Sequence, residues 1–217
     1  MPTPSADPSP DRAFAGLHAD QSVATVHEAA GRVGALSHAI KPIARGMRLS
    51  GAAFPLSLRP GDNLALHEAL YLAPAGSVLV VDAYDYLEAG PFGEIMAIAA
   101  KTQGIAGLVT SGSVRDLDAI AAVGFPVFSK GICVKGTDKH VPAHLGRAVV
   151  IDGVEVRPGD WVLGDSDGVV VVPGQQADLV LQRAIERDAK ERRVMDLVRQ
   201  GQRTLDIYDF GSKAVNT

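Results

Sequence analysis

Short apolar runs alternate with amphipathic segments of helical length through the first half of the chain. Residues 22–31 (SVATVHEAAG) begin with a Ser that can cap a helix and end with a Gly that can stop one. Residues 48–58 have the composition of a strand, and Arg59-Pro-Gly-Asp62 is typical of a turn. The pattern then predicts a helix over residues 64–72 and a buried strand over residues 77–82.

The same alternation continues through the centre of the chain. It predicts helices over residues 92–103 and 116–123, and strands over residues 107–110 and 125–128. Helices of about ten residues between apolar strands are typical of βαβ units, in which the strands run parallel. We therefore expect a parallel βαβ core in this part of the chain.

The last third of the chain has a different pattern. Residues 149–172 hold three short apolar runs separated by Asp-Gly and Pro-Gly turns, which is typical of β-hairpins or a small barrel-like lobe. Residues 175–199 have the pattern of a long charged helix. The sequence thus predicts an α/β fold with an antiparallel C-terminal lobe, built as a flexible tail over residues 1–13 and a single domain over residues 14–217.

The composition of the chain limits which binding partners and which cellular location are expected. Of the 217 residues, 47% are hydrophobic and 21% are charged, and the formal net charge is −4. No dense Lys/Arg block appears and aromatic residues make up only 5%, so we expect no nucleic-acid partner. No apolar run reaches the roughly 18 residues that span a bilayer, so no membrane partner is expected. Residues 1–10 do not resemble a signal peptide, and a cytoplasmic location is expected.

Several common catalytic motifs are missing from the sequence. His27 and His67 each begin a His-Glu pair like that of zinc proteases, but neither has a second His four positions later. The single Cys133 cannot provide an intrachain disulfide or a cysteine-based zinc site. There is no phosphate-binding Gly-rich loop with Lys-Ser/Thr, and no Gly-x-Ser-x-Gly sequence. Nucleotide-dependent and serine-hydrolase chemistry therefore have no support.

A first candidate site is the glycine-rich turn Gly90-Pro-Phe-Gly-Glu-Ile-Met96, which follows a predicted strand and opens a predicted helix. The first amides of a helix have no partner within it, so those near Glu94, Ile95 and Met96 could bind a carboxylate. Alternatively, Gly93 merely permits a tight turn between strand and helix.

A second candidate is Ser111-Gly-Ser-Val-Arg-Asp116, which follows the next predicted strand. Ligands of parallel sheets collect where the strands end, so this segment and the glycine-rich turn are expected to lie together. Arg115 could hold a carboxylate or another oxyanion, and Asp116 could be one ligand of a largely hydrated Mg²⁺. The alternative is a helix-capping aspartate beside a surface arginine.

Lysines form the third candidate, in Lys130-Gly-Ile-Cys-Val-Lys-Gly-Thr-Asp-Lys139 after the following strand. They could attract a polyanionic substrate or form a Schiff base, although solvated loop lysines are the usual explanation. Glu28 and Glu191 stand on predicted helices at opposite ends of the chain, and by themselves they indicate only surface carboxylates.

Short sequence blocks between about residues 22 and 210 carry a family pattern. They are Thr25-Val-His-Glu-Ala-Ala-Gly-Arg32, Pro60-Gly-Asp-Asn63, Phe92-Gly-Glu-Ile-Met96, Gly112-Ser-Val-Arg-Asp116, Phe125-Pro-Val-Phe-Ser-Lys130, Lys135-Gly-Thr-Asp-Lys139, Pro158-Gly-Asp160, Gly164-Asp-Ser-Asp-Gly168 and Leu205-Asp-Ile-Tyr208. In this order they resemble the RraA-like superfamily, and within it the class II (metal-dependent) 4-hydroxy-4-methyl-2-oxoglutarate/4-carboxy-4-hydroxy-2-oxoadipate aldolases.

The resemblance implies a swivelling β/β/α fold that assembles as a homotrimer or hexamer, with active sites between subunits. It implies a small-molecule oxo-acid substrate and a divalent metal, Mg²⁺ or Mn²⁺, as cofactor. Asp116 matches the metal ligand, and Arg115 matches an arginine that contacts the keto or enolate oxygen. The turn Gly93-Glu-Ile-Met96 matches the backbone amides that hold the pyruvyl carboxylate.

Further catalytic residues follow from the same resemblance. Glu94 matches an acidic residue that orients an active-site water, although the aldolases usually have Asp there. Lys139 matches the lysine of the aldolase branch. Glu28 and Glu191 match acidic residues that reach the site from a neighbouring chain. The implied reaction is retro-aldol cleavage that releases pyruvate through an enolate, with oxaloacetate decarboxylation as a side activity.

Two alternatives remain open at this point. The first is a non-catalytic member of the same fold, a regulator that binds and inhibits ribonuclease E. The second is a Schiff-base aldolase that uses Lys130, Lys135 or Lys139 instead of a metal. Borohydride trapping with pyruvate, together with indifference to EDTA, would distinguish the second alternative from the metal-dependent reaction.

Overall fold

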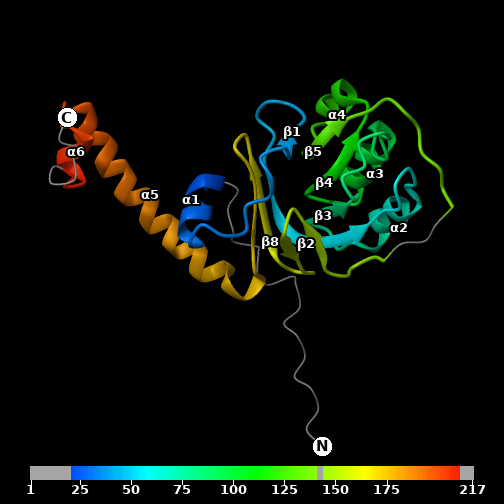
Figure 1. The fold of residues 1–217 in the computed structure, drawn as a ribbon, viewed down its shortest axis with the longest axis horizontal. Coiled ribbons are helices and arrows are strands. Elements are labelled where there is room, and N and C mark those ends of the chain that lie inside the picture. The colour runs from blue at the N-terminus through cyan, green and yellow to red at the C-terminus, as the bar shows by residue number, and fades with distance from the viewer. Residues whose placement is uncertain (1–20, 141–143, 211–217) are drawn as a thin grey trace, which may run out of the picture.

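The computed structural model describes residues 21–140 and 144–210, in which a curled mixed sheet carries helices on its outer surfaces (Figure 1). The strands are β1 (Lys41–Pro42), β2 (Leu49–Ser57), β3 (Ser77–Asp82), β4 (Gly107–Val114), β5 (Val127–Ile132), β6 (Val149–Ile151), β7 (Val154–Val156), β8 (Trp161–Asp165) and β9 (Gly168–Val172). The helices are α1 (Val23–Ala29), α2 (Leu64–Leu72), α3 (Glu94–Thr102), α4 (Leu117–Val123), α5 (Ala177–Arg199) and α6 (Thr204–Ile207).

Four parallel strands form the centre of the main sheet, whose strand order is β1-β5-β4-β3-β2-β8-β9. Strands β2, β3, β4 and β5 pair in parallel and are joined by helices α2, α3 and α4, so the predicted α/β class and βαβ core are confirmed. The carboxyl ends of these strands therefore share one edge of the sheet, where ligands of such folds collect.

Strand β4 is longer than the sequence pattern predicted. It continues past residue 110 to Val114, and its register with β5 shifts by one residue between Thr110 and Ser113. The segment looked like the end of a strand because its serines are polar, yet Ser111 and Ser113 are buried and hydrogen-bonded. A bulge of this kind increases the local twist and is common beside active sites.

The antiparallel part predicted for the last third of the chain is present, but its strands are divided between two sheets. Strands β6 and β7 form a separate hairpin, whereas β8 pairs antiparallel with β2 and thereby extends the main sheet to β9. The segment before β1 links the opposite edges of the sheet, because the amide of Leu36 donates to the carbonyl of Val169 on β9 (3.0 Å). The main sheet is consequently almost closed.

Three apolar clusters stabilise this arrangement. The first lies between the parallel strands and helices α2, α3 and α4, and includes Phe92 and Phe125. The second fills the inside of the curled sheet beneath the β6–β7 hairpin, around Phe128. The third joins α1 and the start of α5 to β8 and β9, with Trp161 at its centre. Helices α1 and α5 therefore stand on a different side of the sheet from α3 and α4 (Figure 1).

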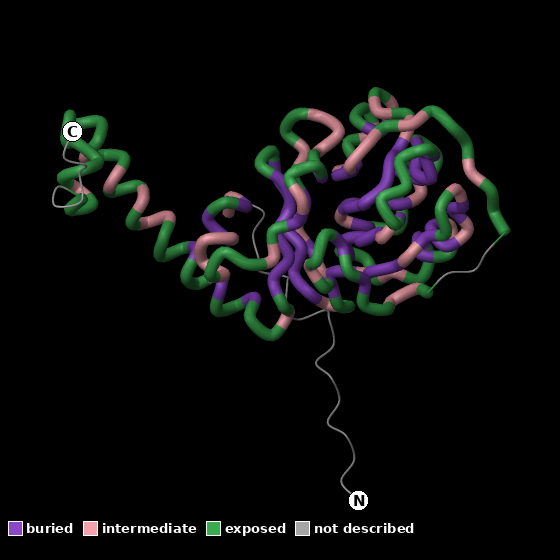
Figure 2. The backbone as a smooth tube through the Cα atoms, viewed as in Figure 1, coloured by how far each residue is buried: buried purple, intermediate pink, exposed green. Residues whose placement is uncertain are grey.

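Helix α5 packs on the sheet and on α1 through its first half, as far as the described residues show. The buried residues of α5 are Ala177, Val180 and Ala184, whereas Met195 and Val198 in its second half are exposed. Figure 2 shows the second half of this helix projecting from the body of the chain. Within the described ranges, no helix is long and apolar enough to cross a membrane. The predicted tail over residues 1–13 lies outside the described residues.

Candidate active site

The glycine-rich turn after β3 presents the N-terminus of α3 at the carboxyl edge of the sheet. Gly93 is the residue before the helix, and the first intrahelical bond runs from the amide of Ala97 to the carbonyl of Gly93. The amides of Glu94, Ile95 and Met96 therefore precede the helical hydrogen-bond ladder. The Glu94 amide donates to Oδ2 of Asp116 (3.1 Å). The amides of Ile95 and Met96 follow it in the turn for which carboxylate binding is predicted.

Arg115 and Asp116 follow β4 and meet this turn. The amide of Arg115 donates to the carbonyl of Phe92 (3.0 Å), which fixes the two segments against each other. Asp116 has a left-handed backbone conformation (φ 60°, ψ 42°), which few residue types other than Gly, Asn and Asp adopt readily. Its Oδ2 lies 3.6 Å from Nε of Arg115, and both side chains are 43% exposed. The predicted pairing of the two strand ends is thus present, with both charged groups open to a ligand.

Two glycines allow the glycine-rich turn to lie close to Arg115 and Asp116. A Cβ atom on Gly93 would lie 2.4 Å from Oδ2 of Asp116 and 3.1 Å from Nε of Arg115. A Cβ atom on Gly90 would lie 2.4 Å from the carbonyl oxygen of Cys133 and 2.9 Å from Cβ of Arg115. The backbone of the turn therefore lies where any side chain would displace the charged pair.

The remaining residues of the turn have different environments. Glu94 is exposed at the first position of α3, where a carboxylate interacts favourably with the helix dipole. Ile95 is 80% exposed beside it. The side chain of Met96 is buried, and its sulfur accepts a hydrogen bond from Nδ2 of Asn63 (3.7 Å). Only the backbone of Met96 is therefore available to a ligand.

Two of the three candidate lysines are engaged in ion pairs. Nζ of Lys130 lies 2.7 Å from Oδ1 of Asp85 and 2.6 Å from Oδ1 of Asp152. Burial lowers the pKa of Lys130, but its hydrogen bonds to these two carboxylates outweigh that effect and raise the pKa above its ordinary value. Lys135 pairs with Glu88, and this hydrogen bond raises the pKa of Lys135. These ion pairs favour the charged form of both lysines, whereas attack on a carbonyl group requires the neutral amine.

Lys139 is exposed and lies in a segment that pairs with the turn after β2. The amide of Asn63 donates to the carbonyl of Asp138 (3.1 Å), and the amide of Asp138 donates to the carbonyl of Gly61 (2.8 Å). Nδ2 of Asn63 also donates to the carbonyl of Pro91 (2.9 Å), just before the glycine-rich turn. The structure therefore places Lys139 at the edge of the sheet that also carries the glycine-rich turn.

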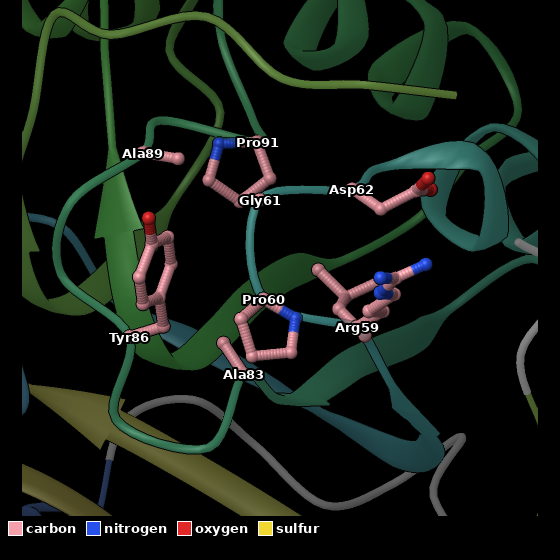
Figure 3. A pocket seen from close by; sticks show the side chains of 9 residues that line it. Arg59, Pro60, Gly61, Asp62, Ala83, Tyr86, Ala89 and Pro91 are labelled. Atoms are coloured by element: carbon pink, nitrogen blue, oxygen red, sulfur yellow. The ribbon is translucent and has the colours of Figure 1, made fainter. Parts of the chain in front are cut away.

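Two hollows in the described part of the chain are lined by residues other than Arg115 and Asp116. The first, of about 10 Å³, lies between residues 59–62 and the loop after β3, where the ring of Tyr86 stands beside Gly61 (Figure 3). It has room for about one water molecule. The second, of about 190 Å³, lies between α1 and the turn that joins β8 and β9. The charged pair at the end of β4 lies instead on an open surface.

A metal ion at this site would depend on few protein ligands. Among the residues that the structure describes, no group of three or more His, Cys, Asp or Glu side chains is placed to hold a metal. Asp116 offers carboxylate oxygens on an exposed side chain, and Mg²⁺ often takes one or two carboxylates and completes its shell with water and substrate oxygens. This donor set fits a largely hydrated Mg²⁺ or Mn²⁺.

The same segments are matched by a family model described as Aldolase/RraA, which covers residues 21–171. The chain belongs to the RraA-like family. A relative from Halalkalibacterium halodurans, named "Putative 4-hydroxy-4-methyl-2-oxoglutarate aldolase", is 36% identical over 167 residues, which cover 75% of this chain and 80% of the relative. The resemblance inferred from the sequence blocks is therefore confirmed.

Solved structures show the same RraA-like fold. A protein from Pseudomonas syringae pv. tomato is 30% identical with a TM-score of 0.78, covering 85% of this chain and 87% of that one. The RNA-processing inhibitor RraA from Thermus thermophilis is 27% identical with a TM-score of 0.66, covering 71% of this chain and 93% of that one. The fold expected from the resemblance is thus confirmed.

Glu28 and Glu191 lie apart from Arg115 within this RraA-like chain but close to each other. Glu28 on α1 accepts hydrogen bonds from Nε of Arg32 (3.0 and 3.2 Å), which lower the pKa of Glu28. Arg187 on α5 lies 2.8 Å from Glu191 and 3.9 Å from Glu28. The two carboxylates therefore share one face of α1 and α5, and in one chain this face is separated from the charged pair by the sheet.

The sequence did not predict the buried polar residues whose hydrogen bonds connect the segments of the site. In the sequence Asn63 stands out only as part of a family block, whereas in the structure its side-chain amide donates hydrogen bonds that link the turn after β2 to Pro91 and Met96. The roles of Ser111 and Ser113 as partners of the loop after β3 were also missed. The run of small and polar residues from Thr110 to Ser113, followed by the apolar Val114, is the signal that could have extended the strand to these serines.

Proposed function

We propose that this protein is a divalent-metal-dependent aldolase that cleaves a 4-hydroxy-2-oxo dicarboxylic or tricarboxylic acid and releases pyruvate. The observation that carries this proposal is the meeting of the first amides of α3, a guanidinium group and a carboxylate at the end of β4. The Glu94 amide and Nε of Arg115 both approach Oδ2 of Asp116, so the three groups face one small space. The name of the Halalkalibacterium halodurans relative supports the same reaction class.

The pyruvyl half of the substrate matches the charges of the turn. Its carboxylate would bind the amides of Ile95 and Met96, where the helix dipole favours an anion. Its keto oxygen would accept a hydrogen bond from Arg115, whose side chain is half-exposed and anchored at its backbone. A bound Mg²⁺ or Mn²⁺, held by Asp116, would act as a Lewis acid that stabilises negative charge on the keto oxygen.

Glu94 is the proposed partner of the catalytic water. Its carboxylate is exposed beside the bound pyruvyl group, so it can orient a water that removes the proton of the C4 hydroxyl group. The C3–C4 bond then breaks, a carbonyl group forms at C4, and the electron pair of the broken bond enters the pyruvate enolate. Arg115 stabilises this enolate until C3 is protonated and pyruvate leaves. Oxaloacetate would lose CO₂ through the same enolate, which makes its decarboxylation the proposed side activity.

The first test of this proposal is pyruvate release with and without metal. Candidate substrates are 4-hydroxy-4-methyl-2-oxoglutarate, 4-carboxy-4-hydroxy-2-oxoadipate and oxaloacetate, each assayed with Mg²⁺ and with EDTA. Turnover is expected with Mg²⁺, and EDTA is expected to lower it at least ~100-fold because the enolate then loses its Lewis acid. Borohydride with pyruvate should leave the enzyme active and unmodified. Activity that resists EDTA and is trapped by borohydride would instead establish a Schiff-base lysine.

The alternative function within the family is regulation by binding. The similarity to the RNA-processing inhibitor RraA from Thermus thermophilis is the observation in its favour. A protein that releases no pyruvate from any of the three substrates, but binds and inhibits ribonuclease E, would establish this alternative. The exposed charged pair at the end of β4 favours the aldolase, because an inhibitory surface does not require helix amides, arginine and carboxylate to converge.

We further propose a homotrimer or hexamer in which Glu28 and Glu191 complete the site of a neighbouring chain. Glu191 lies on α5 beyond the buried residues of that helix, on the face that it shares with Glu28 through Arg187, and this supports the arrangement. Figure 2 shows the end of α5 projecting from the body of the chain, where a neighbouring chain could reach it. The solution mass is then expected to be three or six times 22.7 kDa.

Mixing two inactive variants tests the shared site. Asp116→Asn damages the part of the site on one chain, and Glu191→Gln damages the part donated by its neighbour. When the two are dissociated, mixed in equal amounts and reassembled, about a quarter of the sites combine both native residues, so about a quarter of the wild-type activity is expected to return. Each variant reassembled alone is the control. A mixture that stays inactive would show that Glu191 does not act across subunits.

A further inference from the structure

A nearly buried lysine lies outside the proposed chemistry. Lys130 on β5 has a side chain that is only 10% exposed, and its ammonium group is shared by Asp85 and Asp152 at 2.7 and 2.6 Å. Asp152 belongs to the turn of the β6–β7 hairpin, whereas Asp85 belongs to the loop after β3. The lysine therefore joins the sheet to two segments that are far apart in the sequence.

The loop that contains Asp85 leads directly into the glycine-rich turn of the site. Its residues Tyr84 and Asp85 both have left-handed backbone conformations, with φ of 52° and 56°. Such conformations are sparsely populated and persist only where the surroundings hold them. The amide of Tyr84 donates to Oδ1 of Asp82 (2.9 Å), and Lys130 holds the carboxylate of Asp85.

Neutral contacts fasten the rest of this loop to β4. The amide of Ala83 donates to Oγ of Ser111, and Oγ of Ser113 donates to the carbonyl of Leu87, both at 2.9 Å. A Cβ atom on Gly131, next to Lys130, would lie 2.6 Å from Oγ of Ser113 and 3.3 Å from a methyl carbon of Leu87. The loop is thus packed closely against the end of the sheet by neutral contacts, and two ion pairs, Asp85 with Lys130 and Glu88 with Lys135, add charged contacts to it.

We propose that Lys130 is a positioning residue, which through Asp85 fixes the loop that carries Gly90 and Gly93 to the charged pair at Arg115 and Asp116. This role rests on the proposed aldolase function, because it concerns the same site. Without the ammonium group, the carboxylates of Asp85 and Asp152 would repel each other, and the loop would move away from the sheet. A displacement of about 1 Å at a reacting group can lower a rate ~100-fold.

Matched variants separate positioning from stability. Asp85→Asn and Asp152→Asn each remove one carboxylate from the same ammonium group, but only Asp85 lies in the loop. Lys130→Met removes the charge with little change in length, and Lys130→Arg restores a cation that can reach both carboxylates. Three kinds of measurement are made on each variant: kcat and KM for pyruvate release, the melting temperature, and hydrogen exchange at the amides of Tyr86 and Gly90. The Tyr86 amide donates to the carbonyl of Ala83 in the loop, and the Gly90 amide donates to the carbonyl of Lys135 after β5.

Asp85→Asn and Lys130→Met are expected to lower kcat by about 10-fold to 100-fold. They should also accelerate exchange of the loop amides about tenfold, while the melting temperature of Asp85→Asn falls by no more than ~4 °C. Asp152→Asn and Lys130→Arg should keep kcat and loop exchange near those of the wild type. Equal losses of kcat in Asp85→Asn and Asp152→Asn, or unchanged exchange in Lys130→Met, would overturn the proposal.

Failure of the proposed aldolase function would be recognised separately. If the wild-type protein releases no pyruvate from any of the three substrates, the proposed aldolase function is wrong. The positioning role of Lys130 is then tested by hydrogen exchange of the loop amides and by binding of oxalate, which is a stable mimic of the pyruvate enolate. Weaker oxalate binding and faster exchange in Asp85→Asn, but not in Asp152→Asn, would support it. Identical exchange in the two variants would contradict it.

Discussion

Asp116→Asn is expected to lower kcat for pyruvate release by about 1000-fold while the protein keeps its fold. Asparagine tolerates the left-handed conformation that residue 116 adopts (φ 60°), and its amide oxygen can still accept the hydrogen bond from the Glu94 amide. The substitution therefore removes little except the negative charge. The ion pair with Arg115 that is lost is 43% exposed on both sides, so the free energy of unfolding should fall by no more than about 1 kcal/mol.

The measurement combines kinetics with metal binding. Mn²⁺ binding followed by electron paramagnetic resonance should be weaker in Asp116→Asn than in the wild type. Asp118→Asn is the matched control, because Asp118 is an exposed carboxylate two residues later on α4. It should leave both kcat and Mn²⁺ binding unchanged. If Asp116→Asn retained full activity, Asp116 could not be the metal ligand.

Gly93→Ala is expected to lower kcat/KM by about 100-fold with a small change in stability. The backbone at Gly93 is extended (φ −142°), so alanine can adopt this conformation without strain. The new Cβ atom, however, would lie 2.4 Å from Oδ2 of Asp116 and 3.1 Å from Nε of Arg115. The short aspartate side chain can move aside, which preserves the fold but separates the carboxylate from the Glu94 amide.

Gly136→Ala provides the matched control for this steric effect. A Cβ atom on Gly136 would lie 3.9 Å from a guanidinium nitrogen of Arg115, which is an ordinary van der Waals distance. The kinetics of pyruvate release should therefore differ between the two variants, since Gly136→Ala retains activity and Gly93→Ala loses it. Thermal unfolding should give similar melting temperatures for both. Equal activity of the two variants would show that the closeness of Gly93 to the charged pair has no part in turnover.

The elements of this fold were predictable where hydrophobic periodicity determines them. Helix α2 and strand β3 begin and end at the residues that the sequence pattern gives, because apolar runs and turn residues mark both ends. The pairing of β8 with β2 was not predictable, since antiparallel strands near the C-terminus can form their own lobe or extend an existing sheet with the same local pattern. That choice depends on contacts between residues more than a hundred positions apart.

The site was predictable to a similar extent. Two polar segments that follow neighbouring parallel strands must lie at one edge, and this brought Gly93 and Arg115 together from the sequence alone. The ion pairs of Lys130 were not predictable, because Asp85 and Asp152 reach it from separate loops. The common face of Glu28 and Glu191 likewise required the packing of α1 on α5.

The extra residue in β4 makes the site sensitive to chain length as well as to residue type. Side chains alternate between the two faces of a strand, so removing one residue exchanges the face of every residue that follows. Deletion of Gly112 would turn Arg115 toward the face that Val114 now occupies, and would draw Asp116 away from the Glu94 amide. Descendants of this gene could therefore accept many substitutions in β4 and keep the site, whereas the loss of one codon there would remove it in a single step.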